Sequence, residues 1–186
     1  MKNSTVYKDV QQAQLALGYR TFGIEDERRY AMAVLDAVLG RGMSSRLFQE
    51  VREKRGLSYD IASRQQFFRG AGMFAITAGL AADKCEATLA VIDRELKRVC
   101  EKKVGAAELK RVKEFLIGNF RLGHEKVVAK MFFYGSTILA FGRFVSVQEQ
   151  IEGIRRVTAA EIQAVAKAVF RPANRSVSWV LPKRNG

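Results

Sequence analysis

The sequence predicts an α+β fold, a two-layer sandwich in which an antiparallel sheet is covered on one face by helices. Segments that alternate apolar and polar residues lie near both ends and before the middle of the chain, and longer segments with helical spacing separate them. This order is typical of an antiparallel sheet with helices packed against it. No repeat or linker divides the 186 residues, which therefore indicate a single domain, with residues 1–9 as a leader and residues 10–186 as the folded unit.

The first half of the chain predicts a strand, two helices and a hairpin. Residues 13–22 alternate in the way of a half-buried strand, and residues 24–40 place apolar side chains at helical spacing. A shorter amphipathic run, residues 44–55, predicts a second helix. Residues 57–68 and 72–80 alternate again, and the glycine-containing turn RGAG joins them, which indicates a β-hairpin.

The second half of the chain predicts mainly helices. Three helical runs occupy residues 82–103, 105–123 and 125–142. Two shorter helices follow within residues 146–170. Residues 174–183 alternate once more and predict the strand that closes the sheet.

Several residues at the ends of these segments predict helix boundaries. We expect Asp26 to be the N-cap of the first helix and Gly40 to be its C-cap. Gly56 is expected to end the second helix. Thr158 and Glu161, three positions apart at the start of the last helix, form the pattern of a capping box.

The two cysteines are predicted to be free thiols. Cys85 and Cys100 lie in one helical run, where 15 residues separate them. At about 1.5 Å of helical rise per residue, their separation is roughly 22 Å. A disulfide requires Cα atoms within about 7 Å. We therefore expect no disulfide, which fits a reducing compartment.

The composition is that of a globular protein with a large excess of positive charge. Hydrophobic residues make up 48% and charged residues 27%, and the formal net charge is +13. This excess favours an acidic partner, but the basic residues are scattered, so nucleic acid is the less favoured one. No apolar run approaches the roughly 20 residues of a membrane span, and the first residues contain no signal-peptide core. We expect no membrane contact and a cytoplasmic location.

His124 is the only histidine, which excludes several enzyme classes for this chain. A two-histidine zinc motif such as HxxEH cannot be formed, and a site made from His124 and the two cysteines fails because the thiols lie too far apart. Neither a G-x-S-x-G elbow nor a G-x-x-x-x-G-K-[ST] phosphate loop occurs. We expect His124 to have a capping or surface role at a helix junction, and no metal or cofactor in this chain.

The segment GRGMSSRLFQEVREKRGLSYD, residues 40–60, resembles a motif of a known family. The residues that carry the resemblance are Ser44, Ser45, Arg46-Leu47-Phe48, Arg52, Gly56 and Tyr59. They resemble the second, non-zinc-bearing domain of the insulinase/pitrilysin-type zinc metallopeptidases, in particular the mitochondrial-processing-peptidase-like branch. The predicted last helix and closing strand also fit the ending of that domain, so the resemblance covers nearly the whole chain.

The resemblance implies that this chain works beside a zinc-bearing half. In the family the first half binds zinc through HxxEH and a further glutamate, and the second half contributes an arginine and a tyrosine seven positions apart that reach the substrate. Arg52 and Tyr59 stand at this spacing. The implied function is the substrate-binding C-terminal domain of a zinc metalloendopeptidase, inactive without a zinc-bearing N-terminal domain or subunit. Arg52 and Tyr59 would bind the peptide, and Tyr59 would stabilise the oxyanion.

Other interpretations are open at this point. Arg52 could be one more solvated cation in REKR, and Tyr59, on the same strand face as Leu57 and Ile61, could be a core residue. For the chain as a whole, the alternatives are a non-catalytic scaffold or assembly subunit of the same fold and a basic nucleic-acid-binding module.

Overall fold

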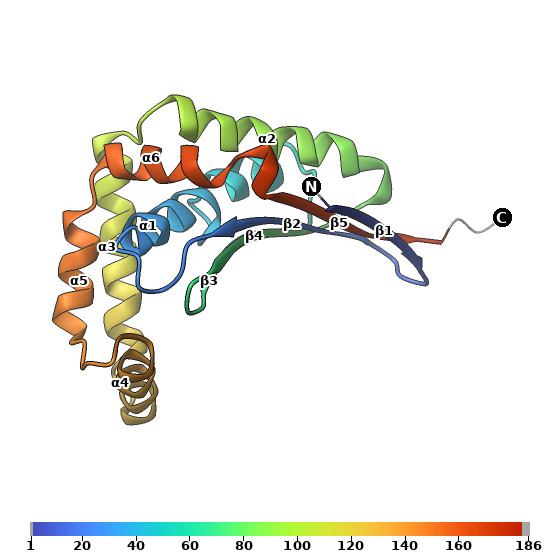
Figure 1. The fold of residues 1–186 in the computed structure, drawn as a ribbon. Helices are drawn as coiled ribbons and strands as arrows, with labels where there is room; N and C mark the ends of the chain where they lie inside the picture. Colours follow the sequence, from blue (N-terminus) through green and yellow to red (C-terminus); the bar gives the residue numbers. More distant parts are fainter. Residues whose placement is uncertain (1, 184–186) are drawn as a thin grey trace.

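The computed structural model describes residues 2–183, which form a five-stranded sheet with helices packed on one face. Figure 1 shows some of these helices above the sheet and the others beyond one end of it, while no described element covers the lower face. The strand order is β1-β5-β2-β4-β3. The predicted two-layer α+β architecture is therefore confirmed.

The helices and strands are β1 (Lys2–Lys8), β2 (Ala13–Thr21), α1 (Arg29–Gly40), η1 (Phe48–Glu53), β3 (Asp60–Phe67), β4 (Gly72–Leu80), η2 (Ala82–Lys84), α2 (Cys85–Glu101), α3 (Ala106–Gly123), α4 (Val127–Phe141), α5 (Val147–Arg156), α6 (Ala159–Val169), η3 (Pro172–Asn174) and β5 (Arg175–Pro182).

The edge strand β1 differs from the prediction. Lys2–Lys8, which the sequence analysis assigned to a leader, form a strand that pairs in parallel with β5. The other three strand pairs are antiparallel, so the sheet is mixed. Residues 3–8 are all exposed, so neither face of this strand is buried. The sequence here accordingly lacks the apolar alternation that marks a half-buried strand. Its pairing rests on main-chain contacts with β5 and on a hydrogen bond of 2.8 Å between the hydroxyls of Ser4 and Ser178.

The two faces of the sheet differ in chemistry. On the helix side, Leu15, Leu17 and Ile76 are buried in the core. On the uncovered side, one row of small residues crosses all five strands in register. From one edge of the sheet to the other, this row consists of Ser4, Ser178, Ala16, Thr77 and Ala62. Because these side chains are short and at least partly exposed, another polypeptide can approach this face closely.

Helix α1 lies against the sheet and carries the predicted apolar stripe. Val34, Leu35 and Leu39 are completely buried, as the helical spacing predicted. Gly40 is not a cap beyond the helix but its last residue. A Cβ on Gly40 would overlap the main-chain nitrogen and the side chain of Ser63 on β3. Glycine is therefore required here because α1 packs tightly on β3, rather than because the helix ends in a left-handed conformation.

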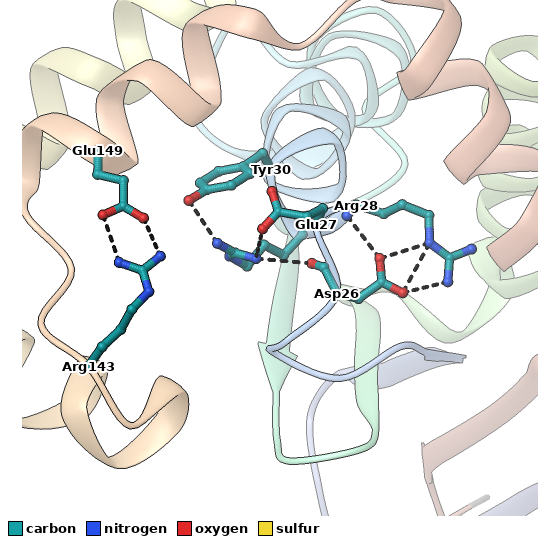
Figure 2. Close-up of polar contacts among 7 residues, drawn as sticks. Asp26, Glu27, Arg28, Tyr30, Arg143 and Glu149 are labelled. Carbon is teal, nitrogen blue, oxygen red and sulfur yellow. Dashed lines mark hydrogen bonds and ion pairs between the residues drawn. The ribbon is translucent and has the colours of Figure 1, made fainter.

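The beginning of α1 also differs from the prediction, because the helix starts at Arg29 and Asp26 does not cap it. The Asp26 carboxylate accepts the main-chain N–H of Arg28 at 2.9 Å and pairs with the Arg28 guanidinium at 2.6 Å, as Figure 2 shows. This short-range bond stabilises the turn before the helix. In contrast, the capping box at the start of α6 is confirmed: the Glu161 N–H donates to the Thr158 hydroxyl at 3.2 Å, and the Glu161 carboxylate accepts the Thr158 N–H at 2.7 Å.

The cysteines are free, as predicted. Burial raises the pKa of both the Cys85 and the Cys100 thiols, which favours the unreactive protonated form. None of the helices within residues 2–183 combines the length and the apolar character that crossing a membrane requires.

Candidate functional site

The candidate site lies on a short helix between α1 and β3. Over residues 44–55 the sequence predicted an ordinary helix, whereas the structure has the wider π-helix η1 (Phe48–Glu53). The N–H of Lys54 donates to the carbonyl of Gln49, five residues earlier, at 2.9 Å. Gly56 follows with a φ of 54°, so the predicted end at this glycine is confirmed. The chain then turns directly toward β3.

Buried contacts hold this helix in place. Leu47, just before η1, and Val51, within it, are completely buried. Arg46 donates two hydrogen bonds to Glu108 of α3, Nε to Oε1 at 2.8 Å and Nη2 to Oε2 at 2.7 Å. A bidentate pair between a guanidinium and a carboxylate combines strength with a fixed geometry. The sequence motif includes Arg46 but gives no sign of its partner Glu108, because 62 positions separate the two residues.

Glu108→Gln is expected to lower the free energy of unfolding by about 1.5 kcal/mol at neutral pH, because it removes a charge-assisted pair. The hydrogen bonds from Arg46 hold the pKa of Glu108 below its usual value of 4.5. The folded protein therefore binds this proton less readily than the unfolded chain does. The stabilisation is present above pH 4.5 and is lost as the pH falls through the lowered pKa. Denaturant unfolding should accordingly show a smaller difference between variant and wild type at about pH 3 than at neutral pH.

Glu114 provides the matched control, because it lies exposed on the same helix and forms no ion pair within residues 2–183. Glu114→Gln should change the free energy of unfolding by less than about 0.5 kcal/mol. If Glu108→Gln were as stable as the wild type at neutral pH, the pair would not anchor the motif.

Arg52 lies on the exposed side of η1. Its side chain is 45% exposed, and its guanidinium lies 5.0 Å from the ring centre of Phe48. The contact with the ring positions the side chain. The ion pair with Glu53, at 3.8 Å between two exposed groups, contributes little to stability. The guanidinium therefore keeps donors available for a ligand.

Tyr59 directly precedes β3 and is 59% exposed. Ser58 and Ile61 are buried, so the alternation of the strand is interrupted here and the Tyr59 side chain is directed to solvent. The interpretation of Tyr59 as a core residue is therefore wrong. Its N–H donates to the carbonyl of Gly79 on β4 at 2.8 Å, which ties this position to the sheet. Its hydroxyl forms no hydrogen bond to another residue in the described part of the chain.

Both candidate residues adjoin the edge strand β3. Helix η1, which carries Arg52, contacts β3 and α2, and Tyr59 leads into β3. Both head groups are exposed, whereas Val51 and Ser58, which directly precede them, are buried. An arginine fork can bind a peptide carbonyl or a carboxylate, and a phenol can donate a hydrogen bond to an oxyanion. The pair is thus chemically suited to binding a peptide.

Residues 2–183 contain no cluster of three or more His, Cys, Asp or Glu side chains that could bind a metal ion. His124 is the C-cap residue of α3, and its Nδ1 lies 2.6 Å from the carbonyl oxygen of Phe120. The predicted capping role of His124 is therefore confirmed.

The sequence from residue 2 to residue 116 matches the family model of the peptidase M16 inactive domain. The chain belongs to the peptidase M16 family. The match includes the segment of residues 40–60 on which the resemblance was based and confirms it. The narrower resemblance to the mitochondrial-processing-peptidase-like branch stays a prediction.

Relatives of this M16 domain are named zinc proteases. An uncharacterized zinc protease of Rickettsia bellii is 37% identical over 169 residues, and one of Streptomyces coelicolor is 39% identical over 163 residues. The two alignments cover 90% and 88% of this chain but only 41% and 36% of the relatives. The crystal structure of a peptidase M16 inactive domain from Pseudomonas fluorescens has a TM-score of 0.86 at 20% identity, and the match covers 98% of this chain and 44% of that chain. The M16 domain described here thus spans less than half the length of these relatives.

Proposed function

We propose that this M16 domain binds peptide substrate beside the zinc site of a zinc-bearing half and completes the cleft of a metalloendopeptidase. The observation that carries the proposal is the contrast within one segment: Arg52 and Tyr59 expose their head groups, while Leu47 and Val51 are completely buried. Hydrogen-bond donors whose backbone is held by buried neighbours are suited to a preorganised substrate site. In this role Arg52 binds a carbonyl or carboxylate of the peptide, and Tyr59 donates a hydrogen bond to the oxyanion as it forms.

The uncovered face of the sheet provides the second part of the proposed cleft. Its central row contains only serine, alanine and threonine. In Figure 1 the sheet arches beneath the helix layer, with its free face on the hollow side. Short side chains on a hollow surface leave room for an extended peptide or for a facing domain. We therefore assign this face to the wall of the cleft.

The zinc ion belongs to the other half in this proposal, because the sequence contains one histidine and no HxxEH motif. Bound there, zinc supplies a polarised water for attack on the peptide carbonyl. The residues of this chain hold the peptide in position and bind the developing negative charge. The chain is therefore inactive on its own.

This proposal predicts that efficient cleavage requires both halves. The purified chain is mixed with the zinc-bearing half encoded in the same genome, and hydrolysis of an internally quenched peptide is measured. We expect no hydrolysis by this chain alone, and a mixture that cleaves at least about tenfold faster than the zinc-bearing half alone, because the second half positions the peptide. The same concentration of heat-denatured chain serves as the control.

Three results would contradict the proposal. A mixture no faster than the zinc-bearing half alone would favour the scaffold interpretation. Unaided hydrolysis by this chain would show that it contains a complete active site. Binding to nucleic acid that falls steeply with rising salt, together with no effect on hydrolysis, would favour the basic nucleic-acid-binding module.

A further inference from the structure

Helix α4 carries an apolar stripe that nothing in the described part of the chain covers. We call it the α4 stripe, and it consists of Val127, Val128, Met131, Phe132, Gly135, Ile138 and Leu139. Each of these positions lies three or four residues from another member of the set, so they share one face of the helix. The exposed fractions of the large side chains run from 52% for Ile138 to 84% for Leu139. Lys130 is the only charged residue of α4, and Thr137 is its only buried residue.

The opposite face of α4 is already occupied, so the stripe cannot turn inward. The ring of Phe133 packs against Phe120 and His124 at the end of α3, with ring centres 5.5 Å and 4.6 Å apart. Tyr134 stacks on Phe144 at 4.5 Å. These aromatic contacts fix the rotation of α4 about its axis.

The C-terminal end of α4 is also held in place. The helix ends at Phe141 and is capped by Gly142, whose φ of 66° is left-handed. The following Arg143 donates two hydrogen bonds to the Glu149 carboxylate on α5, at 3.0 Å and 2.6 Å, as Figure 2 shows. Figure 1 shows α4 projecting beyond the sheet at the far ends of α3 and α5. The stripe is therefore presented at one end of the molecule on a positioned helix.

A stripe of this kind is typical of a contact surface. A helix that is apolar around most of its circumference normally lies in a protein interior. Single exposed apolar residues are common on surfaces, but a contiguous set marks an interaction site. Gly135 lies in the middle of the stripe, and a Cβ at this position would meet nothing within 4 Å. A partner can therefore come close to the backbone of α4 at its centre.

Length and charge favour one occupant. The relatives that contain a domain of this kind are more than twice as long as the part that matches, with 36% and 41% of their length covered. A second copy of this chain would bring together two molecules of formal charge +13, with Lys126 and Lys130 beside the contact in both. An acidic partner would be attracted by the same charges.

We infer that the α4 stripe docks the zinc-bearing half of the peptidase through an apolar surface rimmed by aspartate and glutamate. This inference rests on the proposed function, because it assigns the surface through which the two halves assemble. The stripe is separate from the candidate residues on η1 and β3. Docking and substrate binding can therefore be disrupted independently.

The test is the affinity of this chain for the zinc-bearing half, measured by titration calorimetry. In Phe132→Asp/Leu139→Asp, two carboxylates lie in the stripe, and we expect the Kd to rise at least about thirtyfold, because charges would be buried in an apolar contact. Tyr7→Asp/Phe68→Asp is the matched control, since both residues are exposed aromatics outside α4, and its Kd should stay within about threefold of the wild type. All four substituted positions are exposed, so both variants should keep the denaturation midpoint of the wild type. Amide hydrogen exchange in α4 should slow when the zinc-bearing half is added.

Three outcomes would overturn the inference. One is a stripe variant that binds the zinc-bearing half as tightly as the wild type. Another is a wild-type chain that sediments as a dimer while the stripe variant is a monomer, because a second copy then covers the stripe. The third is stripe-dependent binding to phosphatidylglycerol vesicles without any effect on the affinity for the zinc-bearing half.

Failure of this inference can be distinguished from failure of the proposed function. Arg52→Ala should leave the affinity for the zinc-bearing half within about threefold of the wild type, because Arg52 lies outside the stripe. If the stripe variants bind normally while Arg52 and Tyr59 variants lose hydrolysis, only the docking surface is wrong. If the stripe variants lose binding while the Arg52 and Tyr59 variants hydrolyse peptide normally, only the proposed roles of those two residues are wrong.

Discussion

Tyr59→Phe is expected to lower kcat for peptide hydrolysis about a hundredfold when this chain acts with its zinc-bearing half, because one donor to the oxyanion is lost. Phenylalanine keeps the ring, and the position is 59% exposed, so the free energy of unfolding should change by less than about 0.5 kcal/mol. The measurement is kcat and KM for a quenched peptide at saturating concentrations of both halves. A change confined to KM would mean that the hydroxyl binds the ground state rather than the transition state.

Matched controls separate the site from the rest of the surface. Tyr7 is also 59% exposed but lies on β1, at the opposite edge of the sheet from β3, so Tyr7→Phe should leave kcat unchanged. Arg52→Ala should raise KM about tenfold, because Arg52 holds the peptide before reaction. Arg69 lies at the exposed turn between β3 and β4, so Arg69→Ala should leave KM unchanged. A loss of less than about threefold in kcat/KM for both Tyr59→Phe and Arg52→Ala would remove these residues from the site.

Leu47→Ala is expected to lower the free energy of unfolding by about 3 kcal/mol, because it leaves a cavity beneath η1. Leu47 has no exposed surface and is one of the largest fully buried side chains of the domain. The loss should appear as a lower denaturant midpoint with an unchanged slope. The cavity also weakens the packing of η1, which positions Arg52. We therefore expect kcat/KM to fall by more than the loss of folded protein accounts for.

Met43→Ala is the control for this prediction, because Met43 belongs to the same segment but is 75% exposed. Its substitution should change the free energy of unfolding by less than about 0.5 kcal/mol. If Leu47→Ala were no more destabilising than Met43→Ala, the burial of Leu47 would not anchor the motif.

Patterns within a few residues predicted most of the fold. The helical spacing in α1 predicted the burial of Val34, Leu35 and Leu39, and the alternation around the RGAG turn predicted the hairpin of β3 and β4. The capping box of Thr158 and Glu161 was also correct. In each case the atoms that interact, or that share a face, lie within a few positions of one another, so the local pattern is sufficient.

The incorrect details share a different property. Lys2–Lys8 form a strand because β5, more than 160 positions away, supplies the pairing partner. Gly40 is needed because Ser63 of β3 lies against it, and Asp26 bonds to the turn rather than to the first turn of the helix. The first two contacts join distant segments and leave no periodic pattern in the sequence, so only the folded chain reveals them; the Asp26 bond is local, and the sequence equally allowed a helix cap and a turn at this position.

The candidate site was predicted only as a pair of positions. The motif and the spacing from Arg52 to Tyr59 predicted these two residues as the site, but the alternation of residues 57–61 equally allowed Tyr59 to be buried. The break in alternation at Ser58 and the exposure of Tyr59 decided this question. The bond from Arg46 to Glu108, which holds the motif on α3, had no signal in the sequence.

By itself, the sequence determined the fold class, the family, the free cysteines and the inability of this chain to form an HxxEH zinc site. Only the tertiary structure decided which head groups stay exposed, which face of the sheet is uncovered and that the α4 stripe lacks a partner among the described residues. The physical reason is the range of the interactions. Helical and strand periodicity follows from neighbours along the chain, whereas burial depends on segments that meet only after the chain has folded.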